Sequence, residues 1–197
     1  TQIDRNHKLV ILESGKILPY DKLLIATGSR ARVPVNTWKE ISNVVTLRDV
    51  QDCERLADLL EHANSIAIIG GGWIGLEIAA TARKQGKAVH VFEYADRLCG
   101  RSVSPEVSAF LKDIHEQQGT QIHLDSKNLH LIESSDQTIQ VLNHPQTAQV
   151  FDCVVVGAGA EIAKELGVDA GLDVKDGIVV NCYGQTSDAD IYAAGDV

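Results

Sequence analysis

Three glycines follow an apolar run in the middle of the chain, and an acidic residue follows them at a fixed interval. Gly70, Gly72 and Gly75 form the pattern GxGxxG directly after Ser65–Ile69, and Glu93 lies 18 residues beyond Gly75. Glycines at these positions allow a tight turn after a strand and let a phosphate approach the backbone at a helix N-terminus, where free N–H groups favour negative charge. The spacing predicts a loop that binds the pyrophosphate of a dinucleotide.

Glu93 stands where the second strand of the same unit is expected to end. A carboxylate there accepts hydrogen bonds from the adenosine ribose hydroxyls and repels a 2′-phosphate. The residue therefore predicts binding of NAD(H) rather than NADP(H). The alternative is a glycine-rich turn followed by an incidental surface glutamate.

A second GxG, Gly157-Ala158-Gly159, follows the apolar run Phe151–Val156, but Ile162 stands near the place of a third glycine. We therefore expect no second dinucleotide loop here. Because Gly157 comes at the carboxyl end of a sheet strand, it is expected to border the same crevice as the first loop.

The central block alternates between strand and helix patterns, and Ser65–Ile69 is almost continuously apolar, as strands covered on both faces require. The elements expected after it are a helix Trp73–Gln85, a strand Ala88–Glu93, a helix opened by Ser104 and Pro105 with an apolar stripe at Val107, Phe110, Leu111 and Ile114, a strand Gln121–Leu124, two antiparallel strands within Asn128–Leu142 and a strand Phe151–Val156. A helix from about Asp49 to Leu60 precedes it. The fold class is α/β: a Rossmann-like parallel sheet with helices on both faces plus an antiparallel β element.

The two ends of the chain differ in character from this block. Lys8–Gly28 predicts a β-hairpin, with a strand at Leu9–Leu12, a glycine-containing turn at Glu13–Lys16 and a second strand at Leu23–Thr27 that ends at Gly28. Arg30–Thr37 predicts a segment that passes between domains. For the last block we expect a short helix, a turn at Asp176-Gly177, a strand Ile178–Val180 and a closing segment Ile191–Asp196.

Composition excludes several classes of protein. With 18 Lys and Arg against 27 Asp and Glu, the net charge of −9 argues against a nucleic-acid partner. No run approaches the roughly 18–20 apolar residues of a membrane span, and the four cysteines show neither a CxxC pair nor a zinc-ligand spacing. We expect no metal site, no membrane association and a cytoplasmic protein with reduced cysteines. Because the chain contains no methionine, we expect a fragment of a longer polypeptide.

Several motifs together resemble one known family. The run Gly70–Arg83 (GGGWIGLEIAATAR), with Glu93, Arg97 and Arg101 after it, resembles the NADH domain of FAD-dependent ferredoxin reductases. The most similar branch includes the rubredoxin and putidaredoxin reductases and the apoptosis-inducing-factor flavoproteins. Tyr20–Gly28 is similar to the family's YD-x-L-x-x-ATG segment.

The last residues carry a further motif of that family. Thr186–Asp196 resembles TS-x-x-DIYA-x-GD, whose aspartate hydrogen-bonds the flavin ribityl chain in the family. By this resemblance Thr27, Gly28, Gly195 and Asp196 are expected to contact FAD. The resemblance implies FAD-domain segments at 1–31 and 158–197, both incomplete, around an NAD-binding domain at 32–157.

The resemblance also implies roles for four residues near the glycine loop. Glu77 would lie near the nicotinamide carboxamide and the flavin edge, although a glutamate in a first helical turn also stabilises the helix dipole. Trp73 and Ile74 would lie against the nicotinamide ring, and a plain core role is the alternative for Ile74. Arg101 would bind a phosphate or ribose on the adenosine side, or else be a solvated surface arginine.

The function implied is an NADH-dependent flavoprotein reductase: hydride passes from NADH to FAD, and single electrons then pass to a ferredoxin or rubredoxin, in the service of an oxygenase. The fragment alone is expected to be inactive. Two alternatives stay open. One is an NADH oxidase or disulfide reductase of the same superfamily, with redox cysteines elsewhere in the polypeptide. The other is an NAD-sensing binding module similar to apoptosis-inducing factor.

Overall fold

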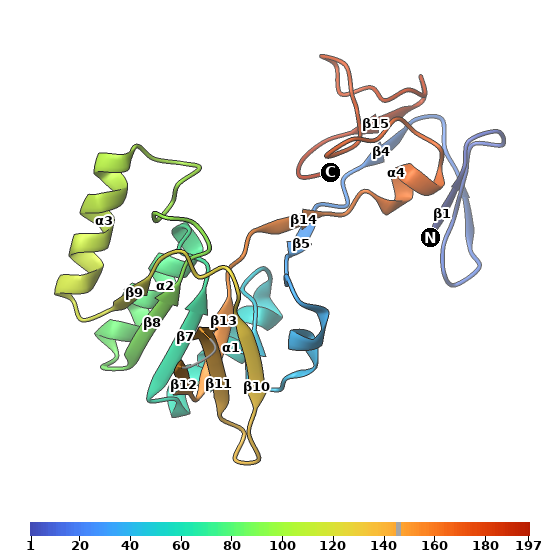
Figure 1. Cartoon of the computed structure of the whole chain (residues 1–197). Coiled ribbons are helices and arrows are strands. Elements are labelled where there is room, and N and C mark those ends of the chain that lie inside the picture. Colours follow the sequence, from blue (N-terminus) through green and yellow to red (C-terminus); the bar gives the residue numbers. More distant parts are fainter. Residues whose placement is uncertain (145–146) are drawn as a thin grey trace. The chain divides into compact units, whose positions relative to one another are not determined.

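The computed structural model describes residues 1–144 and 147–197. Figure 1 shows the course of the chain. The contacts divide it into two compact units, one of residues 31–159 and one of residues 1–30 and 160–197. These boundaries lie close to those expected from the sequence, while the assignment of the units to cofactor domains stays a prediction.

A parallel five-stranded sheet forms the centre of the larger unit, in the order β6-β13-β7-β8-β9. Its strands are β6 (Val44–Val45), β7 (Ser65–Ile69), β8 (Ala88–Phe92), β9 (Gln121–His123) and β13 (Cys153–Val156). Every neighbouring pair is parallel, so all the carboxyl ends meet at one edge. The chain leaves β7 towards β8 on one side, whereas β13 flanks β7 on the other. Such a boundary is the switch point at which open α/β sheets bind ligands.

Helix starts in this unit follow local signals. In α1 (Val50–His62) the Asp49 side chain accepts a hydrogen bond from the Asp52 N–H at 2.8 Å. In α3 (Pro105–Gln117) Ser104 is the N-cap and proline the first residue, as the sequence predicted. The helix between β7 and β8 is α2 (Trp73–Lys84), one residue shorter than expected.

Two different layers cover the sheet. Ile66 and Ile68 of β7 pack with α1 and α2 on one face, whereas Ala67 and Ile69 pack on the other. That second face is covered by the 3-10 helix η1 (Asn36–Glu40) and by the antiparallel sheet β10 (His130–Glu133), β11 (Ile139–His144) and β12 (Thr147–Phe151). The parallel sheet and the antiparallel element are confirmed. Helices were expected on both faces of the sheet. In the part of the chain that the structure describes, the face that carries Ala67 and Ile69 is covered by only one short helix, η1, together with the antiparallel sheet.

The antiparallel sheet has a third strand that the sequence did not predict. The single strand expected at Phe151–Val156 is divided at Asp152 into β12 and β13. The Asp152 carboxylate accepts hydrogen bonds from the N–H groups of Asn64 at 2.7 Å and Ser65 at 2.8 Å. These bonds fix the point at which the chain turns from one sheet into the other.

The apolar stripe of α3 does not face the core as a whole. Val107, Phe110 and Ile114 are 43%, 62% and 41% exposed, and of the stripe only Leu111 packs against a buried cluster. The reason is the position of α3, which packs beside β9, the edge strand of the sheet (Figure 1). Among the described residues, no further strand lies beyond β9 for the rest of the stripe to pack against.

The smaller unit is made of short sheets. An antiparallel sheet joins β1 (Gln2–Asp4), β2 (Leu9–Ile11) and β3 (Ile17–Pro19), while β4 (Leu23–Ile25) pairs in parallel with β15 (Ile191–Ala193). The expected hairpin of Leu9–Leu12 with Leu23–Thr27 is therefore wrong: β3 is the partner of β2, and Pro19 ends it because proline supplies no N–H to continue a ladder.

Three further elements complete the description. β5 (Ser29–Ala31) and β14 (Ala160–Ile162) form a two-stranded sheet where the chain passes between the units, and α4 is Glu165–Asp169. The strand expected at Ile178–Val180 is absent from the described structure, where Ile178 makes only an isolated bridge with Val174.

Candidate functional site

The glycine loop connects β7 to α2 at the carboxyl edge of the parallel sheet, as predicted. Gly72 is the N-cap of α2, and no side chain caps this helix. A Cβ added at Gly72 would meet no atom within 4 Å. The first turn of α2 therefore presents its N–H groups, with the positive end of the helix dipole, to open space that a phosphate can enter.

The other two glycines of the pattern are required by close packing. Gly70 has φ of +115°, and a Cβ there would collide with the backbone carbonyl of Gly157. A Cβ at Gly75 would collide with the Gly70 carbonyl and lie 3.2 Å from Ile68 Cγ2. Gly157 donates its N–H to the Ile69 carbonyl at 2.8 Å, so the end of β13 lies directly beside the loop, at the predicted crevice.

Glu93 follows β8 and is half-buried beside the loop. Its Oε2 accepts a hydrogen bond from the Gly71 N–H at 2.5 Å, and its Oε1 accepts one from the Ala95 N–H at 2.8 Å. Each carboxylate oxygen has two acceptor positions, so both oxygens keep a lone pair for further donors. The carboxylate is thus oriented by the loop itself and can accept hydrogen bonds from ribose hydroxyls.

The N-terminal part of α2 places three predicted residues at the surface. Trp73 and Ile74, in the first turn, are 49% and 48% exposed. Glu77 is exposed as well, but it lies just past the first turn, so its expected place in that turn is wrong. A core role for Ile74 is therefore wrong, because the buried face of α2 carries Leu76 and Ile78 instead. The contact of these side chains with a nicotinamide ring stays a prediction.

The two arginines after β8 behave differently. Arg97 is half-buried and donates to the carbonyls of Gly100 at 2.6 Å and Val103 at 2.8 Å, so it holds the turn that follows β8. Arg101 lies on that turn and is exposed. Its proposed contact with the adenosine half of a dinucleotide is not tested by this geometry.

Four residues predicted to contact flavin lie close together within the smaller unit, at the carboxyl ends of β4 and β15. Thr27 Oγ1 donates to the Ala163 carbonyl at 2.7 Å, and the Gly28 carbonyl accepts from the Ala163 N–H at 3.0 Å. Asp196 Oδ2 accepts from Ser29 Oγ at 3.0 Å. Gly28 and Gly195 have φ of +71° and +85°, so both turns use the left-handed region that favours glycine.

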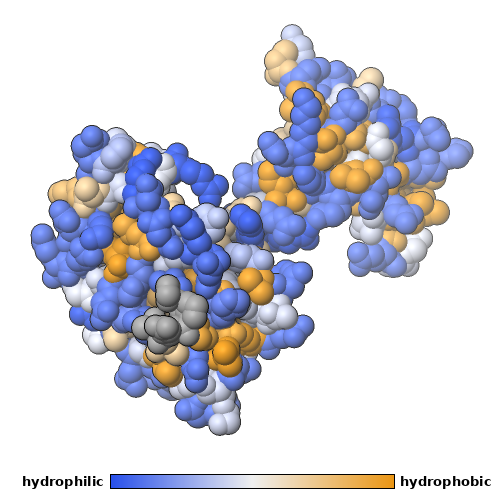
Figure 2. Space-filling model, in the orientation of Figure 1, coloured by the Kyte–Doolittle hydropathy of each residue, from blue (hydrophilic) through white to orange (hydrophobic). Residues whose placement is uncertain are grey.

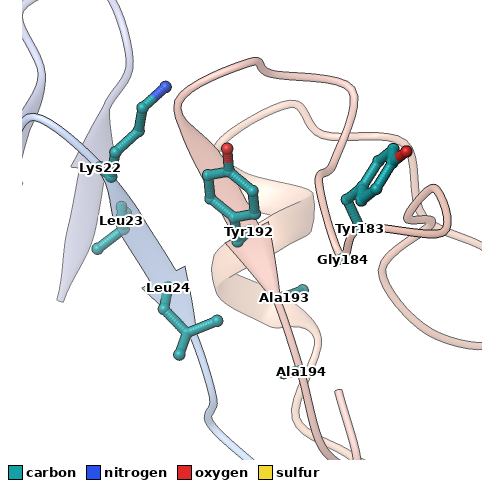
Figure 3. Close-up of a pocket in the computed structure, with 8 residues that line it drawn as sticks. All are labelled: Lys22, Leu23, Leu24, Tyr183, Gly184, Tyr192, Ala193 and Ala194. Atoms are coloured by element: carbon teal, nitrogen blue, oxygen red, sulfur yellow. The ribbon is translucent and has the colours of Figure 1, made fainter.

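A shallow hollow of about 320 Å³ lies in the same unit. Figure 3 shows Leu24, Tyr192 and Tyr183 around it, on β4, on β15 and on the segment before β15. Lys22 Nζ lies 5.9 Å from the Tyr192 ring centroid. None of the predicted cofactor-binding residues lines this hollow.

The sequence reasoning missed two residues that contact the loop. Gly71 is buried between Glu93 and Leu98, and Cys99 donates its N–H to the Gly71 carbonyl at 2.9 Å. The signal in the sequence was the third consecutive glycine at 70–72, because the GxGxxG pattern does not require a glycine at its second position.

The described residues hold no metal cluster, no disulfide and no membrane-spanning helix. Within residues 1–144 and 147–197, no cluster of three or more His, Cys, Asp or Glu side chains could hold a metal ion. The four cysteines are unbridged; Cys99 and Cys153 are buried, and Cys53 and Cys182 are exposed. Among the helices of those residues, none has the length and apolar character needed to cross a membrane.

Comparisons with known proteins identify close relatives. The chain is 38% identical over 197 residues to the ferredoxin–NAD(+) reductase component of the 3-phenylpropionate/cinnamic acid dioxygenase of Photorhabdus laumondii, a match of 100% of this chain and 50% of that protein. It is 35% identical over 195 residues to a rubredoxin-NAD(+) reductase of Pseudomonas putida, matching 98% of this chain and 50% of the relative.

A solved structure is equally similar. In the crystal structure of the covalent putidaredoxin reductase–putidaredoxin complex, the matching chain is 39% identical with a TM-score of 0.94, over 100% of this chain and 48% of that one. The chain spans about half the length of these relatives. The family model described as pyridine nucleotide-disulphide oxidoreductase matches all of residues 1–197. The chain belongs to the pyridine nucleotide-disulphide oxidoreductase family.

Proposed function

We propose that residues 31–159 bind NADH at the glycine loop, and that the full-length protein passes its electrons through FAD to a ferredoxin or rubredoxin. The observation that carries the proposal is the pairing of an uncapped helix N-terminus at Gly72 with the carboxylate of Glu93, which the loop orients through Gly71. A pyrophosphate fits the first, and an unphosphorylated ribose fits the second.

When bound, the cofactors supply the redox chemistry: NADH gives a hydride to FAD, and reduced FAD gives single electrons to the acceptor. The residues of this chain bind and orient them. The N–H groups at the start of α2 would hold the pyrophosphate, and Glu93 would hold the ribose. The nicotinamide would lie against Trp73, Ile74 and Glu77, near the N-terminus of α2. In the smaller unit, the flavin would contact four residues: Thr27, Gly28, Gly195 and Asp196.

The acceptor is proposed from the relatives. Their names describe reductases of a dioxygenase ferredoxin and of rubredoxin, and the solved relative is a complex with putidaredoxin. The dioxygenase named for the first of these supports the further proposal that this protein serves an oxygenase. Unbridged cysteines suit a reducing compartment, and we propose a cytoplasmic location.

The test uses full-length protein in stopped-flow mixing. We expect NADH to reduce the bound flavin and the reduced flavin to reduce an oxygenase-type ferredoxin or a rubredoxin. A variant with serine at Cys53, Cys99, Cys153 and Cys182 is expected to retain most of this activity. Loss of turnover in the serine variant would assign the protein to the disulfide-reductase alternative. Reduction of a disulfide or of oxygen, without reduction of a ferredoxin or a rubredoxin, would assign it to the disulfide-reductase or oxidase alternative.

Glu77→Ala adds a second readout within the same experiment. If Glu77 orients the nicotinamide, its loss is expected to slow flavin reduction by up to about 100-fold, because a misplacement of about 1 Å has effects of that size. Electron transfer from reduced flavin to the acceptor is expected to stay unchanged. Lys84→Ala, at the exposed far end of α2, is the matched control. Unchanged flavin reduction in Glu77→Ala would leave that residue a role in helix stability only.

A further inference from the structure

Gly71 is held on both sides, although it is not one of the three glycines of the fingerprint. Its N–H donates to Glu93 Oε2 at 2.5 Å. Its carbonyl accepts from the Cys99 N–H at 2.9 Å, and the Cys99 thiol lies 3.6 Å from the same oxygen. The two contacts fix the direction of the loop between Gly70 and Gly72.

Cys99, which donates to the Gly71 carbonyl, lies in a hydrogen-bonded turn that we call the Cys99 turn (residues 97–103). Cys99 has φ of +49°, and its carbonyl accepts from Ser102 N–H at 2.8 Å and Val103 N–H at 3.2 Å. The Arg97 side chain stabilises the turn by donating hydrogen bonds to the carbonyls of Gly100 and Val103. These hydrogen bonds within the turn support the Cys99 N–H that contacts the loop.

The contact between this turn and the loop leaves no free space. A Cβ at Gly71 would lie 2.5 Å from Leu98 Cδ2 and 3.1 Å from Glu93 Oε2. Leu98 is 1% exposed, and Ser108 Oγ donates to its carbonyl at 2.7 Å, which ties the turn to α3. Burial, with the Glu93 carboxylate adding to it, raises the pKa of the Cys99 thiol, so the thiol remains protonated and can donate.

We propose that Cys99 is a positioning residue for nucleotide binding: it holds the Gly71 carbonyl while Glu93 holds the Gly71 amide, and together they fix the loop before a ligand arrives. The proposal rests on the proposed function, namely NADH binding at this loop. A loop ordered in advance binds more tightly because the ligand does not have to offset the loss of loop entropy. The same contacts orient Glu93, so the Cys99 turn also acts on the discrimination between NADH and NADPH.

The experiment measures the Kd of full-length protein for NADH and for NADPH by equilibrium titration, in three variants of Cys99. Cys99→Val removes the thiol and places a β-branched residue at a positive φ, and we expect a Kd for NADH about 10-fold higher. Cys99→Ala removes only the long thiol contact and should raise it about 2- to 3-fold. Cys99→Ser keeps a donor and should stay within about 2-fold of wild type.

Two readouts separate positioning from a loss of stability. Cys153→Ala, in the fully buried core of the sheet, is the matched control: it should lower the melting temperature without changing either Kd. Cys99→Val should narrow the ratio of the NADPH Kd to the NADH Kd, which a merely less stable protein would not do.

The outcomes also separate this proposal from the proposed function. Wild-type Kd values and an unchanged ratio in Cys99→Val, alongside lost discrimination in Glu93→Ala, would overturn the positioning role alone. If Cys99→Val does not fold, equal Kd values for Cys99→Ala, Cys99→Ser and wild type would overturn it. NADH binding that survives both Glu93→Ala and Gly75→Val would instead overturn the nucleotide site.

Discussion

The two units of this chain are stabilised by different means. In residues 31–159, both faces of the parallel sheet are closed, and Ile66, Ile68 and Val91 have no exposed surface. In the smaller unit the core cluster contains five buried residues, of which only Ile191 has no exposed surface: Ile25, Leu172, Ile178, Ile191 and Ala193.

Ion pairs join the N-terminal and C-terminal segments of the smaller unit. Asp190 pairs with Lys8 at 2.5 Å and with Lys22 at 2.6 Å, and Arg5 pairs with Asp188 at 2.8 Å. Exposed pairs of this kind are individually weak, because water screens the charges.

Both units carry hydrophobic residues at the surface, as Figure 2 shows. Leu24 of β4 is 58% exposed, and β4 belongs to a sheet of two strands, which is marginal by itself. We therefore expect the flavin-contacting residues of the smaller unit to need further chain for stable packing.

Gly75→Val gives the largest expected effect, and it acts on the larger unit. The added side chain would collide with the Gly70 carbonyl and push α2 away from β7. We expect the Kd for NADH to rise by about 100-fold or more, measured by titration of full-length protein. Gly86→Ala, just past the end of α2, is the control: Gly86 has φ of +79°, so the substitution strains the backbone, but a Cβ there would meet no atom within 4 Å. Equal losses in both variants would show that strain, not the loop, controls binding.

Asp196→Ala tests the smaller unit. In full-length protein we expect the affinity for FAD to fall about 10-fold, the size expected for a lost hydrogen bond to a charged acceptor. The 197-residue chain alone should purify without flavin absorbance. A yellow 197-residue chain with one flavin per molecule would contradict the contrast drawn between the two units.

Acid should affect the two units in different pH ranges. Burial lowers the pKa values of His90, His115 and His123 in the larger unit, so the unfolded chain binds protons first and stability is lost as the pH falls below about 6.5. In the smaller unit, Lys22 and Lys8 lower the pKa of Asp190 to about 2, so that contribution is lost only as the pH falls from about 4 towards 2.

Hydrogen exchange read segment by segment, and corrected for intrinsic rates, distinguishes the two ranges. Between pH 7.5 and 5.5, β8 and β9 should lose protection while β4 and β15 keep theirs. His123→Gln should reduce the loss, because His90 Nδ1 lies 3.1 Å from His123 Nε2 and two charged rings would repel each other. Equal loss in both units would contradict the assignment to these histidines.

The elements around the glycine loop could be predicted from the sequence because their signals are local. The apolar run of β7, the glycines and the caps at Asp49 and Ser104 each lie within a few residues of the structure they determine. The outward stripe of α3 could not be predicted this way, because exposure depends on where the sheet ends. The partner of β4 could not either, since it lies more than 160 residues away at β15.

The same limit applies to the site. Gly72 and Glu93 could be assigned because their spacing reflects one strand, one loop and one helix. Cys99 lies 28 residues from Gly71 in the sequence and contacts it through a turn. Cys99 has a left-handed backbone in this turn, and no residue type in the sequence predicts that conformation. Contacts of this kind become visible only when the fold has brought the two segments together.

The comparison of NADH with NADPH binding tests the central claim most directly. Titration of full-length protein should give a lower Kd for NADH than for NADPH in the wild type, because the Glu93 carboxylate accepts from ribose hydroxyls and repels a 2′-phosphate. In Glu93→Ala, the ratio of the Kd for NADPH to the Kd for NADH should fall by about 10-fold. Equal affinity for the two nucleotides in the wild type, or an unchanged preference in Glu93→Ala, would contradict the account.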